Sequence, residues 1–167
     1  YWRFTGLARV PEGVREWWAI PEANLATATN GMVFCDRLGV FSRWREGLVA
    51  GCPRDVRLKR MAYCCYLAFQ AGPYNRARLA SRNLAAAAQI AETTFVTAAL
   101  RIVYLLNDCY PPFYKWLQPL VRPLPVLGQE SFAYAEALAR IPFSPGGTQA
   151  ERQKAQIVEG WCADLGR

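Results

Sequence analysis

The stretch "LAAAAQIAETTFVTAALRIVYLL" (84–106) decides the fold of this chain. Its alanines favour a helix, since alanine has the highest helix propensity. Apolar residues recur in it at alternating steps of four and three, which places them on one face of a helix. These residues are Leu84, Ala88, Ala91, Phe95, Ala98, Ile102 and Leu105. The pattern predicts a long central helix whose small side chains let neighbouring helices approach closely.

A second stripe on the same stretch is polar. Gln89, Thr93, Thr97 and Arg101 follow one another at helical spacing. Such a stripe either faces solvent or lines a groove, and the first interpretation is the favoured one. After the stretch, Pro111 and Pro112 end the helix, because proline cannot donate to the helical ladder.

The sequence on both sides predicts more helices with short connections. Helices are expected over 12–19, 21–29, 42–50, 55–71, 113–121, 132–139 and 148–165. Gly72 and Pro73 are expected to stop the helix at Ala71. Thr148 and Glu151 have capping-box spacing at the start of the last helix. "MVFCDRLGVF" (32–41) is β-prone around a turn. The predicted fold is therefore mainly α: an antiparallel bundle of about six or seven helices, with one small β-hairpin near 33–41.

The composition is that of one folded domain. The chain has 167 residues, of which 53% are hydrophobic and 20% charged, so it can bury an ordinary core. Its apolar runs are interrupted before the roughly 18 residues that a membrane helix requires, and no segment resembles a signal peptide. We therefore expect a cytoplasmic protein without a membrane partner.

Several kinds of chemistry are excluded by the residues that are missing. The chain has no histidine, so it cannot form a Ser-His-Asp or Cys-His nucleophile system. It has no glycine-rich phosphate loop and no paired aspartates. No C-x-x-C spacing suggests zinc, and the cysteines are expected to be buried reduced thiols. They are Cys35, Cys52, Cys64, Cys65, Cys109 and Cys162. The chain alone lacks a recognisable catalytic or metal site.

The charge favours anionic partners. The net charge is +7, and Arg54, Arg57 and Arg60 recur at spacings of three on the helix over 55–71. This face is either merely solvated, an anion-binding surface, or a surface that docks on another domain. No helix-turn-helix spacing or RNA-binding aromatic motif is present, so nucleic acid is the less favoured partner.

The end of the central helix is the candidate site. "LLNDCYPPFYKW" (105–116) brings an amide, a lysine and four aromatics together. This composition fits a binding pocket and a packing corner equally well. Packing alone is a serious alternative, because large aromatic side chains belong to a core more often than to a binding site. Lys115 could contact a phosphate, or it could lie along the Trp116 ring.

Five short motifs resemble one bacterial family. They are "LATATNGMVFCDRLGVF" (25–41), "PRDVRLKRMA" (53–62), "QAGPYN" (70–75), "LLNDCYPPFYKW" (105–116) and "LPVLG" (124–128). In this order they are similar to the domain of unknown function 4037, a helical domain that follows a nucleotidyltransferase-like domain. The family commonly shows Gln in place of Pro73, and a basic residue at or near Asp108 and Cys109.

The resemblance implies a helical C-terminal portion that needs a partner. Residues 1–16 would be the connection to an upstream domain, and 17–167 the helical domain, family-like over 17–128 and followed by the C-terminal helices (129–167). The upstream domain would hold Mg²⁺ and a nucleoside triphosphate, and the helical domain would position a small-molecule or nucleotide acceptor. The matched motifs imply the substrate-binding residues Tyr74, Asn75, Asn107, Tyr110, Tyr114, Lys115 and Trp116.

Three functions remain open from the sequence. The first is the accessory, substrate-binding domain of a nucleotidyltransferase-like enzyme, inactive alone. The second is a stand-alone interaction module, such as one partner of a toxin–antitoxin-like pair. The third is a basic, nucleic-acid-binding helical protein. The resemblance favours the first.

Overall fold

The chain is mainly helical. The structure, a computed structural model, describes residues 2–167, which contain helices and loops but no β-strand. The helices are α1 (Trp2–Thr5), α2 (Val14–Ala19), α3 (Glu22–Thr29), α4 (Val40–Val49), α5 (Arg54–Phe69), the π-helix η1 (Gln70–Arg76), α6 (Ala77–Ser81), α7 (Ala85–Leu106), α8 (Tyr114–Leu117), α9 (Gly128–Arg140) and α10 (Gln149–Leu165).

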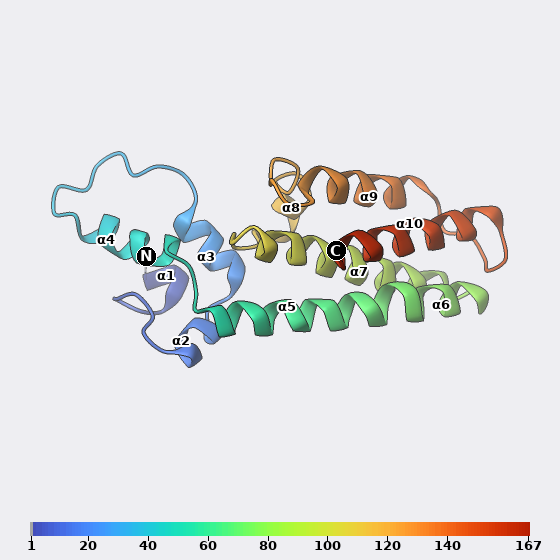
Figure 1. Cartoon of the computed structure of the whole chain (residues 1–167), viewed down its shortest axis with the longest axis horizontal. Helices are drawn as coiled ribbons and strands as arrows, with labels where there is room; N and C mark the ends of the chain where they lie inside the picture. Colours follow the sequence, from blue (N-terminus) through green and yellow to red (C-terminus); the bar gives the residue numbers. More distant parts are fainter. Residues whose placement is uncertain (1) are drawn as a thin grey trace.

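Two apolar clusters hold these helices together. The smaller cluster lies at the end of the molecule where α1 to α4 gather, and it includes Trp17 and Trp44 (Figure 1). The larger cluster surrounds α7 and includes Phe95. Helix α5 contributes to both, through Val56 at its start and Cys64 in its middle. Phe4, Leu7 and Val10, which belong to the segment expected to be a connection, lie against the smaller cluster.

Helix α7 is the central helix that the sequence predicts. The predicted inward residues are buried from Ala88 to Leu105, whereas Leu84 is 48% exposed because it lies just before the helix begins. Figure 1 shows α7 running back beside α5 and α6, with α9 and α10 on its other side. The polar stripe with Thr93 and Thr97 lines a shallow groove of about 540 Å³, which is the less favoured of the two sequence interpretations.

Gly72 and Pro73 do not stop the helix, and this prediction is wrong. The chain continues through η1 into α6, so that α5, η1 and α6 form one rod (Figure 1). A π-turn changes the local hydrogen-bond spacing, which accommodates a residue without an N–H. A Cβ on Gly72 would lie 2.4 Å from Cδ2 of Phe95. Gly72 therefore allows the rod to pack closely against α7, and it does not end the helix.

The β-hairpin near 33–41 is also wrong. Residues 31–39 form a loop without strand pairing, and α4 begins at Val40. The Asp36 carboxylate accepts a hydrogen bond of 2.7 Å from the Ser42 backbone N–H, and Gly39 has a φ of 65°. Asp36 thus satisfies one of the free N–H groups in the first turn of a helix. Residues 36–39, which were predicted to form the turn of a hairpin, instead lead into the first turn of α4.

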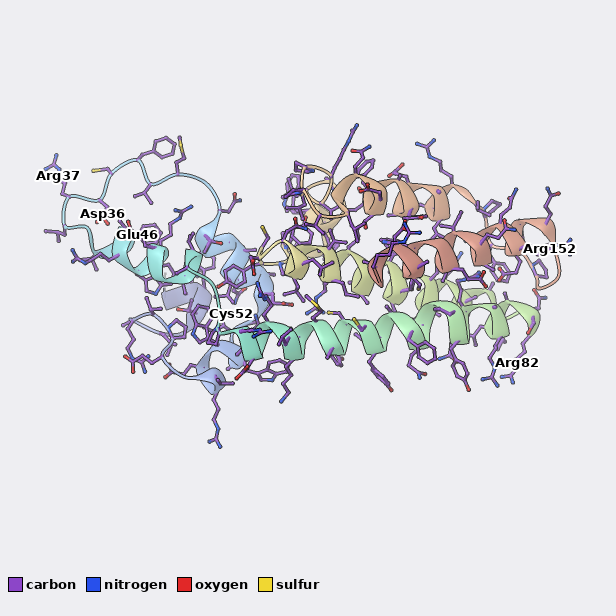
Figure 2. All side chains as sticks on the ribbon, viewed as in Figure 1. Asp36, Arg37, Glu46, Cys52, Arg82 and Arg152 are labelled. Atoms are coloured by element: carbon purple, nitrogen blue, oxygen red, sulfur yellow. The ribbon has the colours of Figure 1, made fainter. Side chains whose placement is uncertain are left out.

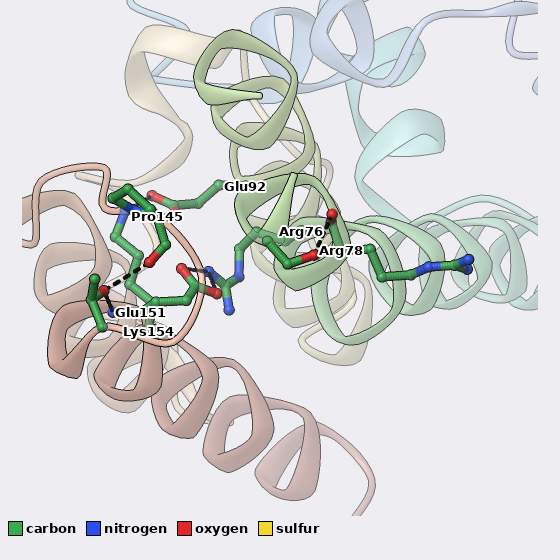
Figure 3. A network of polar contacts seen from close by, with 8 residues as sticks. Arg76, Arg78, Glu92, Pro145, Glu151 and Lys154 are labelled. Carbon is green, nitrogen blue, oxygen red and sulfur yellow. Dashed lines mark hydrogen bonds and ion pairs between the residues drawn. The ribbon is translucent and has the colours of Figure 1, made fainter. Parts of the chain in front are cut away.

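Four charged side chains are enclosed where η1, α7 and α10 meet (Figure 3). Arg76 lies 2.8 Å from Glu151, and Lys154 donates to both carboxylate oxygens of Glu92, at 2.7 and 2.8 Å. Arg76, Glu151 and Lys154 are buried. The Thr148 hydroxyl accepts from the Glu151 N–H, so the predicted N-cap is present, but the Glu151 carboxylate pairs with Arg76. The two pairs join α10 to the body of the fold.

Helix α7 has a composition that bears on the membrane expectation. By length and composition it could cross a membrane, although 50% of the relevant window is buried inside the protein. The expectation that every apolar run is too short was therefore too strong. The helix meets the criterion because it has 22 residues, of which only Glu92 and Arg101 are charged.

All six cysteines are free thiols, as predicted, but they are not all buried. Cys35, Cys65 and Cys109 are exposed, and Cys64 is enclosed between α5 and α7. Burial raises the pKa of the Cys64 thiol from 9.0 to about 11. A raised pKa leaves less of the thiolate, which is the reactive form of cysteine. Cys64 is therefore the cysteine that best fits the predicted buried, reduced thiol.

Cys64 is expected to resist alkylation in the folded protein. At pH 8 the raised pKa alone reduces its thiolate fraction about 100-fold, and enclosure reduces access further. Iodoacetamide labelling followed by peptide mass spectrometry should show Cys35 modified early and Cys64 last. The same experiment in urea is the control, since all the thiols should then react at similar rates. Equal labelling of both cysteines in the native protein would contradict the packing of α5 on α7.

Candidate functional site

A cavity of about 700 Å³ lies between α3, the end of α4 and the corner that follows α7. Tyr104 of α7 lines it, together with aromatic rings from the corner and hydroxyl groups from α3. The lining residues are Ala26, Thr27, Thr29, Asn30, Val49, Tyr104, Asp108, Cys109, Tyr110, Pro112, Phe113, Trp116 and Leu120. The volume is within the range of small-molecule sites in proteins.

Two tyrosine hydroxyls fix the shape of this cavity. The Tyr104 hydroxyl donates to the Leu117 carbonyl at 2.9 Å and so holds α8 against α7. The Tyr110 hydroxyl donates to the Leu48 carbonyl at 2.8 Å and so joins the corner to α4. Burial raises the pKa of both tyrosines above its ordinary value, so both hydroxyls are protonated donors at neutral pH. The walls are therefore formed before any ligand arrives.

Asn107 has a structural position beside the cavity. Its amide nitrogen donates to the carbonyls of Val103, at 2.7 Å, and Val126, at 2.9 Å. Its carbonyl oxygen accepts from the Val126 N–H at 2.9 Å. One side chain thus caps α7 and holds the connector of the "LPVLG" motif. Asn107 does not line the cavity.

The predicted aromatic residues of the corner divide between the wall and the rim. Tyr110 and Trp116 line the cavity, whereas Tyr114 and Lys115 do not. Tyr114 is 76% exposed and packs against the Phe113 ring at 4.5 Å. The Lys115 ammonium lies 5.6 Å from the centre of the Trp116 ring, as the packing interpretation of this lysine expected. Lys115 is exposed and is next to Trp116 in the chain.

Tyr74 and Asn75 lie elsewhere. They belong to η1, which follows α5 away from the N-terminal cluster (Figure 1). The Tyr74 ring stacks on Phe69 with centres 6.2 Å apart, and the Arg78 guanidinium lies 4.8 Å above it. The structure therefore does not bring Tyr74 and Asn75 to the corner. The seven predicted residues do not form one site.

The three predicted arginines also have different surroundings. Arg54 is exposed, and Arg57 pairs with Asp108. Arg60 is only 6% exposed, and it donates to the backbone carbonyls of Trp17, at 2.7 Å, and Ile20, at 3.0 Å. Arg60 thus joins α2 to α5 from within, and it is not part of an exposed basic face.

Sequence reasoning missed the α3 side of the cavity. Thr27, Thr29 and Asn30 all come from the motif "LATATN", and they supply the hydroxyl and amide groups of the lining. Thr27 and Asn30 are three residues apart and so lie on one side of a helix, but only the fold brings this segment to the same cavity as Tyr110. Asp108 is the single charged residue of the lining, and Arg57 neutralises it.

The described residues contain no group of three or more carboxylate, cysteine or histidine side chains that could hold a metal ion. The cavity lining presents aromatic rings, hydroxyl groups, an amide, the Asp108 carboxylate and the Cys109 thiol. Such a lining can bind and orient a ligand.

A comparison with protein families gives one match. The family model described as Domain of unknown function (DUF4037) matches residues 17–117. Except for Leu120, the cavity lining lies within the matched residues. The "LPVLG" motif and helices α9 and α10 lie beyond them. No curated protein and no solved structure matches the chain.

Proposed function

Because the chain belongs to the DUF4037 family, we propose that it is a helical accessory domain that binds the acceptor substrate of a nucleotidyltransferase-like protein. In this proposal a separate upstream domain holds Mg²⁺ and the nucleoside triphosphate, and this chain alone is not catalytic. The observation that carries the proposal is the cavity of about 700 Å³ walled by Tyr110, Phe113 and Trp116. An antiparallel arrangement of the longer helices, supported by α7 running back beside α5, would keep this wall rigid (Figure 1).

The lining indicates which ligands would fit. Rings such as Phe113 and Trp116 stack on a flat or apolar ring, and Thr27, Thr29 and Asn30 provide hydrogen bonds that orient it. No cation lines the cavity. We therefore propose a neutral or positively charged acceptor that carries a ring and several hydrogen-bonding groups. The triphosphate would stay with the upstream domain.

The remaining predicted residues have supporting parts in this proposal. Lys115 and Tyr114 lie at the rim, where Lys115 would meet a phosphate approaching from the partner domain. Arg54 is exposed beside Arg57 and would contribute to docking of that domain. Tyr74 and Asn75 lie outside the proposed site.

Trp116→Ala is expected to weaken acceptor binding selectively. In the protein that includes the upstream domain, the KM for the acceptor should rise about 5- to 10-fold, because one stacking wall is lost. The KM for the nucleotide should not change. Trp18→Ala is the matched control, since Trp18 is 45% exposed, Trp116 is 51% exposed, and Trp18 lies outside the cavity.

The measurement is pyrophosphate release with a panel of ring-bearing acceptors. The isolated chain with Mg²⁺ should show no turnover. Robust turnover by the isolated chain, or an unchanged acceptor KM in Trp116→Ala, would contradict the proposal. So would an upstream sequence without a Gly-Ser loop and paired aspartates.

A further inference from the structure

We propose that the outer face of the α5–η1–α6 rod binds single-stranded nucleic acid. This aromatic–basic face consists of Trp18, Lys59, Tyr63, Tyr66, Phe69, Tyr74, Arg78 and Arg82. It lies outside the lining of the cavity described above. The inference therefore does not depend on the proposed accessory function.

The face is the side of the rod that turns away from α7. The opposite side is buried, and it carries Val56, Arg60, Cys64 and Ala68 at helical spacing. The exposed rings follow at steps of three, three and five along the rod, the longer step falling in η1. Tyr63 is 53% exposed, Tyr66 60%, Phe69 57% and Tyr74 47%. Large rings at this exposure are unusual on a surface that only faces water.

The charge on this face has one sign. Between Asp55 and Glu92 the chain has no acidic residue, and its charged residues there are Arg57, Lys59, Arg60, Arg76, Arg78 and Arg82. Arg60 and Arg76 are buried, and Arg57 pairs with Asp108. Lys59, Arg78 and Arg82 are exposed, and they form no ion pair with any described residue. These three cations are available to an external anion.

Cations and rings are already paired at both ends of the face. The Lys59 ammonium lies 5.1 Å from the centre of the Trp18 ring, and the Arg78 guanidinium lies 4.8 Å from that of Tyr74. Phe69 stacks beside Tyr74. Figure 2 shows Arg82 at the far end of the rod and Cys52 just before its start. From Lys59 to Arg82 the rod covers about 35 Å at helical rise.

Single-stranded nucleic acid is the partner that uses both features. Unpaired bases stack on exposed aromatic rings, while neighbouring phosphates contact the cations. An acidic protein surface would use the cations but would leave the rings without stacking partners. In a duplex the bases stack on one another, so their faces are not open to Tyr63 and Tyr66. A single strand can therefore contact both the rings and the cations along the whole face.

The rings provide the most specific test. Anisotropy of a labelled 15-nucleotide single strand of U or T should report binding at low salt. Tyr63→Ala/Tyr66→Ala should weaken it about tenfold or more, because stacking on two rings is lost without any change in charge. The control is Met32→Ala/Phe34→Ala, which removes two large apolar side chains that are 77% and 91% exposed outside the face and should leave binding unchanged.

The charges give a second, independent test. Lys59→Ala/Arg82→Ala should weaken binding and reduce the slope of log K against log salt by about 1.4. The charge-matched control is Arg37→Ala/Arg152→Ala, which removes two exposed cations that form no ion pair with any described residue. Arg37 lies in the loop before α4 and Arg152 on α10 (Figure 2). Circular dichroism of each variant checks that it folds.

The proposal is overturned by any of four results. These are no binding at low salt, equal losses in the face variants and their matched controls, duplex binding as tight as single-strand binding, and competition by polyglutamate of equal charge as effective as by the strand. Equal losses would indicate that the +7 net charge alone attracts the strand. Effective polyglutamate competition would indicate an acidic protein partner instead.

Discussion

Trp161→Ala is expected to lower the free energy of unfolding by about 3–5 kcal/mol. The Trp161 side chain is fully buried in the larger cluster. It packs edge-on against Phe95 with ring centres 5.4 Å apart, and stacks on Tyr134 at 5.7 Å. Its indole N–H donates to the Ser131 hydroxyl at 3.0 Å. The substitution leaves a cavity between α7, α9 and α10, and a buried hydroxyl without its partner.

Urea unfolding followed by far-ultraviolet circular dichroism measures this loss without relying on tryptophan fluorescence. The midpoint should fall while the slope stays constant, since the surface exposed on unfolding changes little. Trp18→Ala is the control, because Trp18 is 45% exposed and its loss should cost about 0.5 kcal/mol or less. Equal midpoints for the two variants would mean that α10 does not pack on α7 as described.

The sequence predicts the regular parts of this fold well. The predicted inward residues from Ala88 to Leu105 are buried as their spacing indicates, because one long apolar stripe can be buried in few ways. Thr148 caps α10 as expected, since capping is a local interaction. The family resemblance is confirmed over residues 17–117. These features depend on neighbours along the chain or on one continuous helix face.

The failures occur where distant segments decide the local structure. Gly72 and Pro73 usually end a helix, but here the approach of Phe95 favours continuation of the rod. "MVFCDRLGVF" has no neighbouring strand to pair with, so its turn begins α4. The ion pair between Glu92 of α7 and Lys154 of α10 joins residues that are remote in sequence. No local pattern contains these partners.

The candidate site was predictable to a similar degree. Part of the motif at 105–116 lines a cavity, including Tyr110 and Trp116. The α3 wall, with Thr27 and Thr29, is remote in sequence and required the fold. The arginine pattern was misleading because Arg60 points inward to backbone carbonyls. The exposed rings of the aromatic–basic face are unevenly spaced in the sequence, because the π-helix η1 changes the helical period between Phe69 and Tyr74. The period of a regular α-helix does not predict this spacing.

Arg76→Met is expected to destabilise the protein by about 3–5 kcal/mol, because it leaves the Glu151 carboxylate buried without its cation. Arg76 is 2% exposed and Glu151 7% exposed. Figure 3 shows Arg76 pointing toward Glu151, whereas Arg78 points away from the network. Arg78→Met removes the same charge from an exposed site two residues further along, and should change stability by about 0.5 kcal/mol or less.

The double variant Arg76→Met/Glu151→Leu separates the pair from its burial cost. A buried ion pair must overcome the loss of hydration of both charges, and the Arg76 Nε makes no hydrogen bond within the described residues. Replacing both partners with apolar side chains should therefore restore stability to within about 1 kcal/mol of the original protein. Glu151→Leu alone leaves Arg76 buried without its anion and should also cost about 3–5 kcal/mol, so the double-mutant cycle from urea unfolding should give a coupling of about 5 kcal/mol or more. If the double variant is as unstable as Arg76→Met alone, the side-chain shapes hold η1 to α10, and the charges do not.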